Sequence, residues 1–123
     1  MENAVETHVY REPFEIERRL KELHLTLKGL LKVRGVAIGA SAEATEFHPR
    51  NAPGLLAYLH GTWALRDEFV HKGWKQDSTD GVESIRYDSA KIKVIFANVD
   101  MACNDVFLPK PRSEKGAGAE RAC

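Results

Sequence analysis

The sequence has few cysteines, no excess of either charge and no long apolar run. It contains two cysteines in 123 residues, and 18 basic side chains balance 18 acidic ones. A protein that follows a nucleic-acid backbone over a large surface usually has a basic excess, so this balance argues against such a surface. The uncharged stretch at residues 35–42 is far too short to span a membrane.

The beginning of the sequence lacks the features of a secretory signal. Residues 1–8 contain no basic n-region and no apolar run. The two cysteines, Cys103 and Cys123, belong to no Cys-x-x-Cys pair. Together these absences predict a cytoplasmic protein with free thiols and no membrane segment.

Length and composition predict one domain of ordinary globular type. The chain is 43% hydrophobic and 29% charged, and its length matches a single core. We expect a polar N-terminal segment over residues 1–12 and a single α+β domain over residues 13–106. Residues 107–123 form a C-terminal tail rich in proline, glycine and basic side chains.

An apolar stripe predicts the first helix over residues 14–33. Its members recur at spacings of four and three residues: Ile16, Leu20, Leu23, Leu27 and Leu30. Pro13 suits the first turn, Gly35 is a reasonable stop, and the basic side chains from Lys28 onward would then suit the end of the helix dipole. Leucines at 23, 25 and 27 also alternate as in a strand, but the longer stripe favours a helix. Residues 35–40 are expected to form a short buried strand.

A second helix is predicted to begin near Asn51 and Pro53 and to end at Gly73. Its apolar side chains form two neighbouring rows: Leu55, Leu56, Leu59, Trp63 and Val70 in one, and Tyr58, Leu65 and Phe69 in the other. Such a wide apolar face should pack on more than one element, with Trp63 in the core. The opposite side of the helix carries a smaller and more polar set: His60, Ala64, Asp67 and His71.

The remaining part of the domain predicts a β-hairpin. Apolar side chains alternate over residues 84–87 and 92–97, and residues 88–91 form the turn between them. The order of elements predicts an α+β fold in which two main helices pack on a small sheet containing the hairpin, followed by an extended tail.

No arrangement of residues predicts an active site or a bound metal. Asp67 and His71 are four residues apart, but the third and fourth ligands of a zinc site are missing. Cys103 follows the predicted buried strand and would be a nucleophile only beside a histidine that lowers its pKa. We therefore expect no catalytic residue, no metal and no cofactor, and an enzyme that uses Cys103 is the least favoured alternative.

The C-terminal tail has two interpretations. The tail carries three basic side chains for contact with an anionic group: Arg112, Lys115 and Arg121. Its backbone around Ser113 and the nearby glycines would allow a concavity whose N–H groups hold an anion. The same composition is typical of a disordered chain end. The tail is therefore either a contact arm or a frayed terminus.

The segment from residue 98 to residue 121 resembles the C-terminal ends of small uncharacterised proteins of bacterial prophages and integrative elements. The similar features are Asn98, Asp100, Pro109, Arg112-Ser113, Lys115-Gly116 and Glu120-Arg121. The resemblance implies an accessory protein of a mobile element, such as a phage, that handles nucleic acid or binds a host protein. It brings no activity and no catalytic residue with it, and the similar proteins continue beyond this segment.

Two functional hypotheses follow. The first is a non-enzymatic interaction protein of a mobile genetic element that docks on a host or element-encoded protein or ribonucleoprotein. Aromatic side chains dominate interface energies, so the candidate anchors are Trp63, Trp74 and Tyr87. All three could instead be core residues, which is the favoured position for Trp63, and Trp74 is the predicted binding residue among them. The alternative is a small DNA- or RNA-binding protein that uses Lys91 and Lys93 of the hairpin together with the basic residues of the tail.

Overall fold

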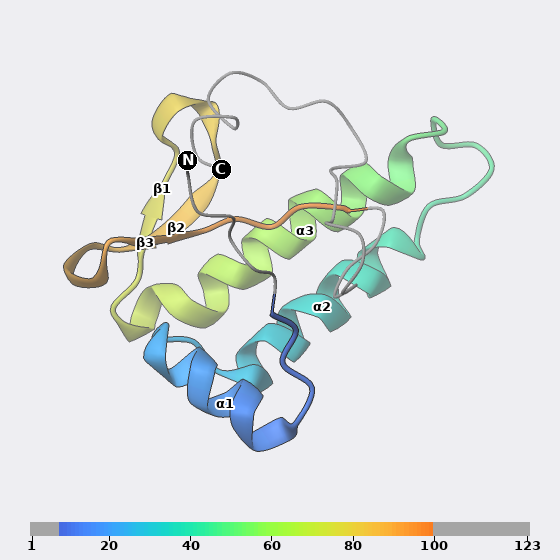
Figure 1. Ribbon diagram of the computed structural model, residues 1–123. Helices are drawn as coiled ribbons and strands as arrows, with labels where there is room; N and C mark the ends of the chain where they lie inside the picture. Colours follow the sequence, from blue (N-terminus) through green and yellow to red (C-terminus); the bar gives the residue numbers. More distant parts are fainter. Residues whose placement is uncertain (1–7, 100–123) are drawn as a thin grey trace, which may run out of the picture.

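The computed structural model describes residues 8–99 (Figure 1). Within this range three helices precede a three-stranded antiparallel sheet, which confirms the predicted α+β fold. The elements are α1 (Pro13–Glu22), α2 (Leu27–Ser41), α3 (Ala52–Phe69), β1 (Lys75–Asp77), β2 (Ser84–Tyr87) and β3 (Ile92–Val94). No helix within residues 8–99 combines the length and the apolarity needed to cross a membrane.

The helix predicted over residues 14–33 is in fact two helices, α1 and α2. His24 has a φ of 62°, in the left-handed region that few non-glycine residues adopt. The backbone N–H of Leu25 donates to the carbonyl of Leu20 at 2.8 Å, and that of His24 donates to the carbonyl of Lys21 at 3.0 Å. These two bonds form a Schellman motif, which ends α1 without the glycine that usually marks such an ending.

The second helix begins at once after this break. The Thr26 side chain accepts a hydrogen bond from the Gly29 backbone N–H at 3.1 Å, so Thr26 is the N-cap of α2. The new helix runs straight through residues 35–40, and the predicted strand there is wrong. Residues 33, 37 and 40 are all buried, which is a helical spacing. A run of small apolar residues fits both the helical and the strand period, and packing against α3 stabilises the helix.

The extent of α3 was predicted well, but the buried face was not. A 3₁₀ turn over Val70–Lys72 and a left-handed Gly73, with φ 97°, end the helix as expected. The side chains that face α2 and the core are mostly small: Ala57, Gly61, Ala64, Leu65 and Phe69 are buried. The large row that includes Trp63 instead lies on the outer side of the helix, so the prediction that Trp63 is a core residue is wrong.

Two glycines show how closely the helices are packed. A Cβ atom on Gly29 would lie 2.7 Å from Cζ of Phe69, and one on Gly61 would lie 2.6 Å from the ring of Phe96. Carbon atoms do not approach so closely, so larger residues at these positions would force the neighbouring rings to move. Gly29 therefore allows the close contact of α2 with α3, and Gly61 allows Phe96, in the segment after β3, to pack closely on α3.

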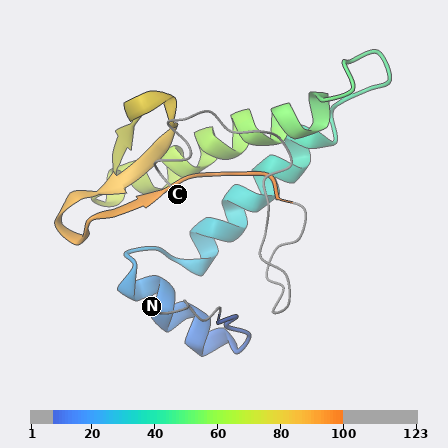
Figure 2. The same cartoon turned by 45° about the horizontal axis from the view of Figure 1, so that its top comes forward.

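The sheet has the order β1-β2-β3, with antiparallel pairing throughout. Lys75 pairs with Arg86, and Ile85 pairs with Val94, so the predicted hairpin is confirmed. The first strand was not predicted, because residues 75–77 have no apolar alternation. In Figures 1 and 2 the sheet lies near the C-terminal end of α3, and the loop between α2 and α3 projects at the opposite end. After β3 the chain runs back across the helices, where the Asn98 side-chain amide donates to the Gly54 carbonyl at 3.0 Å.

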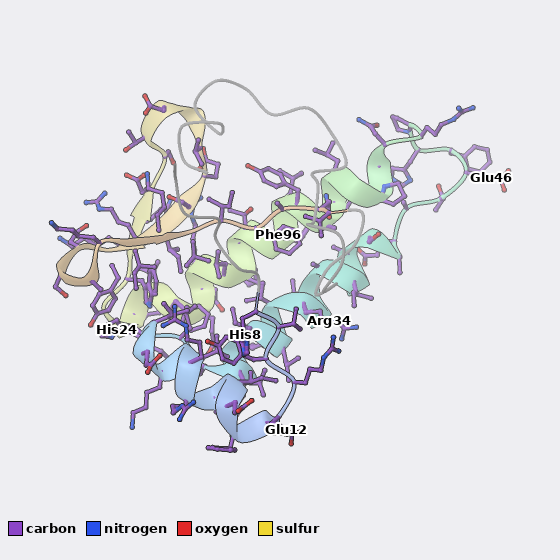
Figure 3. All side chains as sticks on the ribbon, in the orientation of Figure 1. His8, Glu12, His24, Arg34, Glu46 and Phe96 are labelled. Carbon is purple, nitrogen blue, oxygen red and sulfur yellow. The ribbon has the colours of Figure 1, made fainter. Side chains whose placement is uncertain are left out.

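The core lies where the α1–α2 junction, the end of α3 and the sheet meet. Trp74 is 2% exposed, and its Nε1–H donates to the His24 carbonyl at 2.9 Å. The Trp74 ring meets the rings of Phe69 and Tyr87 edge-on, and Tyr87 stacks on the His24 ring at 4.0 Å. Figure 3 labels His24 at this junction. Trp74 therefore holds the helical part and the sheet together.

Candidate functional site: an apolar groove beside helix α3

The outer face of α3 carries a row of large apolar side chains. Leu55, Leu59 and Trp63 follow one another at four-residue intervals and are 50%, 51% and 59% exposed. At this spacing side chains stand above one another on one helix face. Clusters of exposed apolar side chains mark binding surfaces far more often than single ones do. We call this row the outer row of α3.

A groove lies beside the outer row. Its volume is about 650 Å³, which is within the range of protein sites that bind ligands or peptide side chains. The wall on one side is formed by α3 and the start of the following 3₁₀ turn, and the other is formed by residues near β1 and β2. The lining residues are Tyr58, Leu59, Thr62, Trp63, Arg66, Asp67, Val70, His71, Gln76 and Glu83.

One wall of the groove is fixed by Arg66. Its Nη2 donates to Oε1 of Glu83 and to the carbonyl of Asp77, both at 2.9 Å, and to the carbonyl of Ser84 at 3.3 Å. The guanidinium thus joins α3 to β1 and β2. A hydrogen bond from the Ser78 hydroxyl, and next the bond from Arg66, lower the pKa of Glu83 below its usual value. The ionised Glu83 therefore compensates the charge of Arg66, and the wall is preorganised.

The rim of the groove retains a negative charge at Asp67, whose side chain is exposed. His71 lies one turn further on and lines the same groove. The sequence had placed these two residues on the side of α3 opposite the large apolar row. Their presence beside Trp63 in one groove corrects that prediction, since the buried face of α3 is the one with small residues.

Thr62 contributes a buried polar atom to the groove. The residue is 6% exposed, and its Oγ1 has no hydrogen-bond partner within the part of the chain that the structure describes. A buried hydroxyl without a partner is unfavourable, because it loses its bond to water and gains none in return.

Replacing Thr62 by valine is expected to raise the free energy of unfolding by about 1 kcal/mol, because a methyl group of similar shape takes the place of an unpaired hydroxyl. The change is measured as an increase in the urea midpoint at constant slope. Thr62→Ala is the control, since it leaves a small void and should not stabilise the fold. A Thr62→Val variant less stable than the wild type would mean that the hydroxyl has a partner within the chain.

The basic side chains of the sheet are paired with acidic ones. Asp77 is buried, and its carboxylate accepts from Arg86 Nη1 at 2.9 Å and from the Thr79 hydroxyl at 2.7 Å, with Lys93 Nζ at 3.2 Å. The hydrogen bond from Thr79, followed by that from Lys93, holds the pKa of Asp77 far below its usual range. Lys93 therefore forms an ion pair with Asp77 within the folded chain.

Asp77 is expected to make the fold sensitive to acid. Because its pKa is lower in the folded state, its stabilising effect is complete above the unfolded value of about 4 and is lost as the pH falls below it. We expect the urea midpoint to fall between about pH 5 and pH 2, with a smaller fall in Asp77→Asn, which is less stable at pH 7. Equal pH dependence in the two proteins would contradict this role.

The structure separates the predicted binding residues. Trp74 lies in the core, so its ring is not available as a surface anchor, and that prediction is corrected. Lys91 is exposed in the turn before β3, with φ 56°, whereas Lys93 is bound to Asp77. The predicted tail residues Arg112, Ser113, Lys115 and Arg121 lie outside the described residues, as does Cys103. The predictions for the tail are therefore still predictions.

The groove itself was missed by sequence reasoning. The available signal was the second face of the helix: Ala57, Gly61 and Ala64 form a row of small residues that suits a close helix contact. Had that row been taken as the buried one, the large row would have been recognised as the exposed face. Among residues 8–99, no three His, Cys, Asp or Glu side chains are grouped so that they could hold a metal ion.

Comparisons with protein-family models, with curated proteins and with solved structures found no match for this chain. Function must therefore be inferred from the groove, its lining residues and the faces that the fold leaves exposed.

Proposed function

We propose that this chain is a non-enzymatic interaction protein that binds an amphipathic helical segment of another protein in the groove beside α3. The observation that supports this most directly is the exposure of Trp63 at the C-terminal end of the outer row, with leucines on the preceding turns. Tryptophan is the residue type most enriched at the energetic centres of interfaces. The buried face of α3 consists mostly of small residues, and Trp63 is not part of it.

The shape of the outer row favours a helix as the ligand. Leu55, Leu59 and Trp63 lie along the axis of α3, and Val70 continues the apolar surface two turns further. A helix laid along α3 presents its own apolar side chains at spacings of three and four, so several can enter the groove at once. The exposed carboxylate of Asp67 at the rim selects for a basic residue at one end of that helix.

The nucleic-acid alternative receives less support from the described residues. Lys93 and Arg86 contact Asp77, and Lys75 Nζ lies 3.4 Å from Oδ2 of Asp88. Side chains that are already engaged in ion pairs release fewer counterions on contact with phosphates. Two parts of the proposed function are still predictions: that the protein belongs to a mobile element, and that its C-terminal tail contacts a partner. Residues 100–123 lie outside the described range.

Panning a library of displayed helical peptides on the immobilised full-length protein tests the proposal. We expect enriched peptides with apolar residues at i, i+3 or i+4, and i+7, and with a basic residue near one end. Their binding should depend on Trp63 and Leu59 and should be unaffected by Phe47→Ser, which removes an exposed aromatic ring from the α2–α3 loop.

The same proteins also test the alternative. If no peptide is enriched, or if binding is unchanged in Trp63→Ala, docking in the groove is wrong. Oligonucleotide binding that falls steeply with salt and is unaffected by Trp63→Ala would replace it with the nucleic-acid hypothesis.

A further inference from the structure

The outer face of α2 carries a second exposed seam. Leu31, Gly35, Ile38 and Ala42 recur at spacings of four, three and four, and all are exposed. Leu31 and Ile38 are each 53% exposed. The buried residues of α2, which include Val33 and Ala37, lie on the opposite side. A seam of this period is the pattern that a second helix recognises.

Close packing requires a glycine at position 29 of α2 but not at positions 35 and 39. A Cβ atom on Gly29 would collide with neighbouring groups, whereas one on Gly35 or Gly39 would meet no atom within 4 Å. Glycine lowers the stability of a helix interior, and nothing in the described part of the chain requires it at these two positions. A glycine on an exposed helix face lets another backbone or a large side chain approach closely.

The charges at the ends of α2 are opposite to those that suit an isolated helix. Lys28 lies in the first turn, which contains no acidic residue, and Glu43 follows the C-terminal end, where the last turn contains no basic residue. The helix dipole favours the reverse arrangement at both ends. The sequence predicted Lys28 to lie toward the C-terminal end of one long helix. Because α1 and α2 are separate helices, it lies instead in the first turn of α2.

We propose that this face of α2 binds the same face of a second copy of the chain, in antiparallel orientation about a two-fold axis. If the seam is centred between residues 36 and 37, Leu31 lies opposite Ala42 of the second copy, and Gly35 lies opposite its Ile38. Each large side chain then meets a small one, as close packing requires. One pair of contacts generates the other by symmetry, so the interface closes as a dimer.

Antiparallel pairing also explains the charges. Lys28 of one copy then lies within a turn of Glu43 of the second copy, on the same side of the seam, and this contact occurs twice. The opposed helix dipoles add to the attraction. Parallel pairing would instead place Lys28 beside Lys28 and Ile38 beside Ile38. The contact between Lys28 and Glu43 and the sizes of the seam side chains therefore favour the same orientation.

The dimer face is separate from the groove beside α3, since it lies on the outer side of α2 and includes none of the groove residues. Self-association through the outer row of α3 would be a different contact. Variants on the two helices distinguish these possibilities, and they also separate the failure of the dimer from the failure of the proposed function.

Sedimentation equilibrium of the full-length chain tests the dimer. A single seam of about three turns is at the small end of specific interfaces, so we expect a dissociation constant on the order of 10–100 µM. Leu31→Asp should weaken the dimer at least tenfold, as should Gly35→Leu, which fills the space for Ile38 of the second copy. Leu55→Asp, at an equally exposed leucine of α3, should leave it unchanged.

A charge exchange tests the orientation. Lys28→Glu and Glu43→Lys should each weaken self-association, whereas an equimolar mixture of the two should form a dimer at least as well as the wild type. Both changes suit the helix dipole, so they should not unfold α2. A wild-type chain that stays monomeric at about 500 µM overturns the proposal, as does a dimer that Leu31→Asp does not weaken. A mixture that fails to recover overturns the antiparallel arrangement.

Discussion

Replacing Trp74 by alanine is expected to lower the free energy of unfolding by about 3–5 kcal/mol. The side chain is 2% exposed and meets the rings of Phe69 and Tyr87. Its removal opens a cavity between α3 and the sheet and leaves the His24 carbonyl without the indole donor. A domain of this size is typically stable by about 5–15 kcal/mol, so the variant should be close to unfolding at room temperature.

Urea denaturation followed by far-ultraviolet circular dichroism measures this effect. Trp74→Phe is the informative control, because it keeps an aromatic ring but removes the hydrogen bond to His24. We expect an intermediate loss of about 1–3 kcal/mol for this variant. A loss below about 1 kcal/mol for Trp74→Ala would mean that Trp74 does not hold the core together.

The other tryptophan should behave in the opposite way. Trp63→Ala is expected to change the free energy of unfolding by no more than about 0.5 kcal/mol, because the ring is mostly exposed. The same variant should weaken binding of a helical ligand in the groove by about 30-fold or more, which corresponds to about 2 kcal/mol. The ring lines the groove, where a ligand would exclude water from it.

Fluorescence separates the two tryptophans. Emission from Trp63 should be accessible to acrylamide and should shift to shorter wavelength when a ligand binds, whereas Trp74 should be protected throughout. Affinity is measured with a labelled peptide, and Phe47→Ser serves as a matched loss of an exposed aromatic ring. Loss of binding in Phe47→Ser equal to that in Trp63→Ala would place the binding surface at the α2–α3 loop instead.

The helix pair has an unusual distribution of side-chain sizes. The buried faces of α2 and α3 contain small residues, such as Gly29, Ala37 and Ala64, while leucine, isoleucine and tryptophan lie on the outer faces. Small residues let the two backbones approach closely, but they bury less apolar area than larger ones. Stability then depends strongly on the junction with the sheet around Trp74, and the outer faces are available for other chains.

The structure also places two proposed interfaces on different helices. The groove beside α3 has polar groups for a specific ligand, including the Asp67 carboxylate and the fixed Arg66–Glu83 pair. The seam on α2 is self-complementary and lacks such groups. A dimer formed through α2 would present two grooves, and a partner with two helical segments would then bind more tightly than one with a single segment.

Local patterns in the sequence determined the fold class, the extent of α3 and the hairpin. Alternation over residues 84–87 and 92–94 suits strands only, and the turn between them is short, so the pairing depends on near neighbours. Pro53 and Gly73 likewise mark the ends of α3 through their own backbone preferences.

The tertiary structure alone decided three other features. His24 adopts a left-handed conformation at the point where Leu25 is buried and the Trp74 indole N–H donates to the His24 carbonyl, whereas the sequence pattern predicted a continuous helix. The buried face of α3 depends on how closely α2 can approach, so small residues prevail over large ones. Lys93 forms an ion pair with Asp77 because the sheet brings β1 and β3 together on either side of β2. Each outcome depends on contacts between segments that a local pattern does not contain, and for that reason the candidate site became visible only in the folded chain.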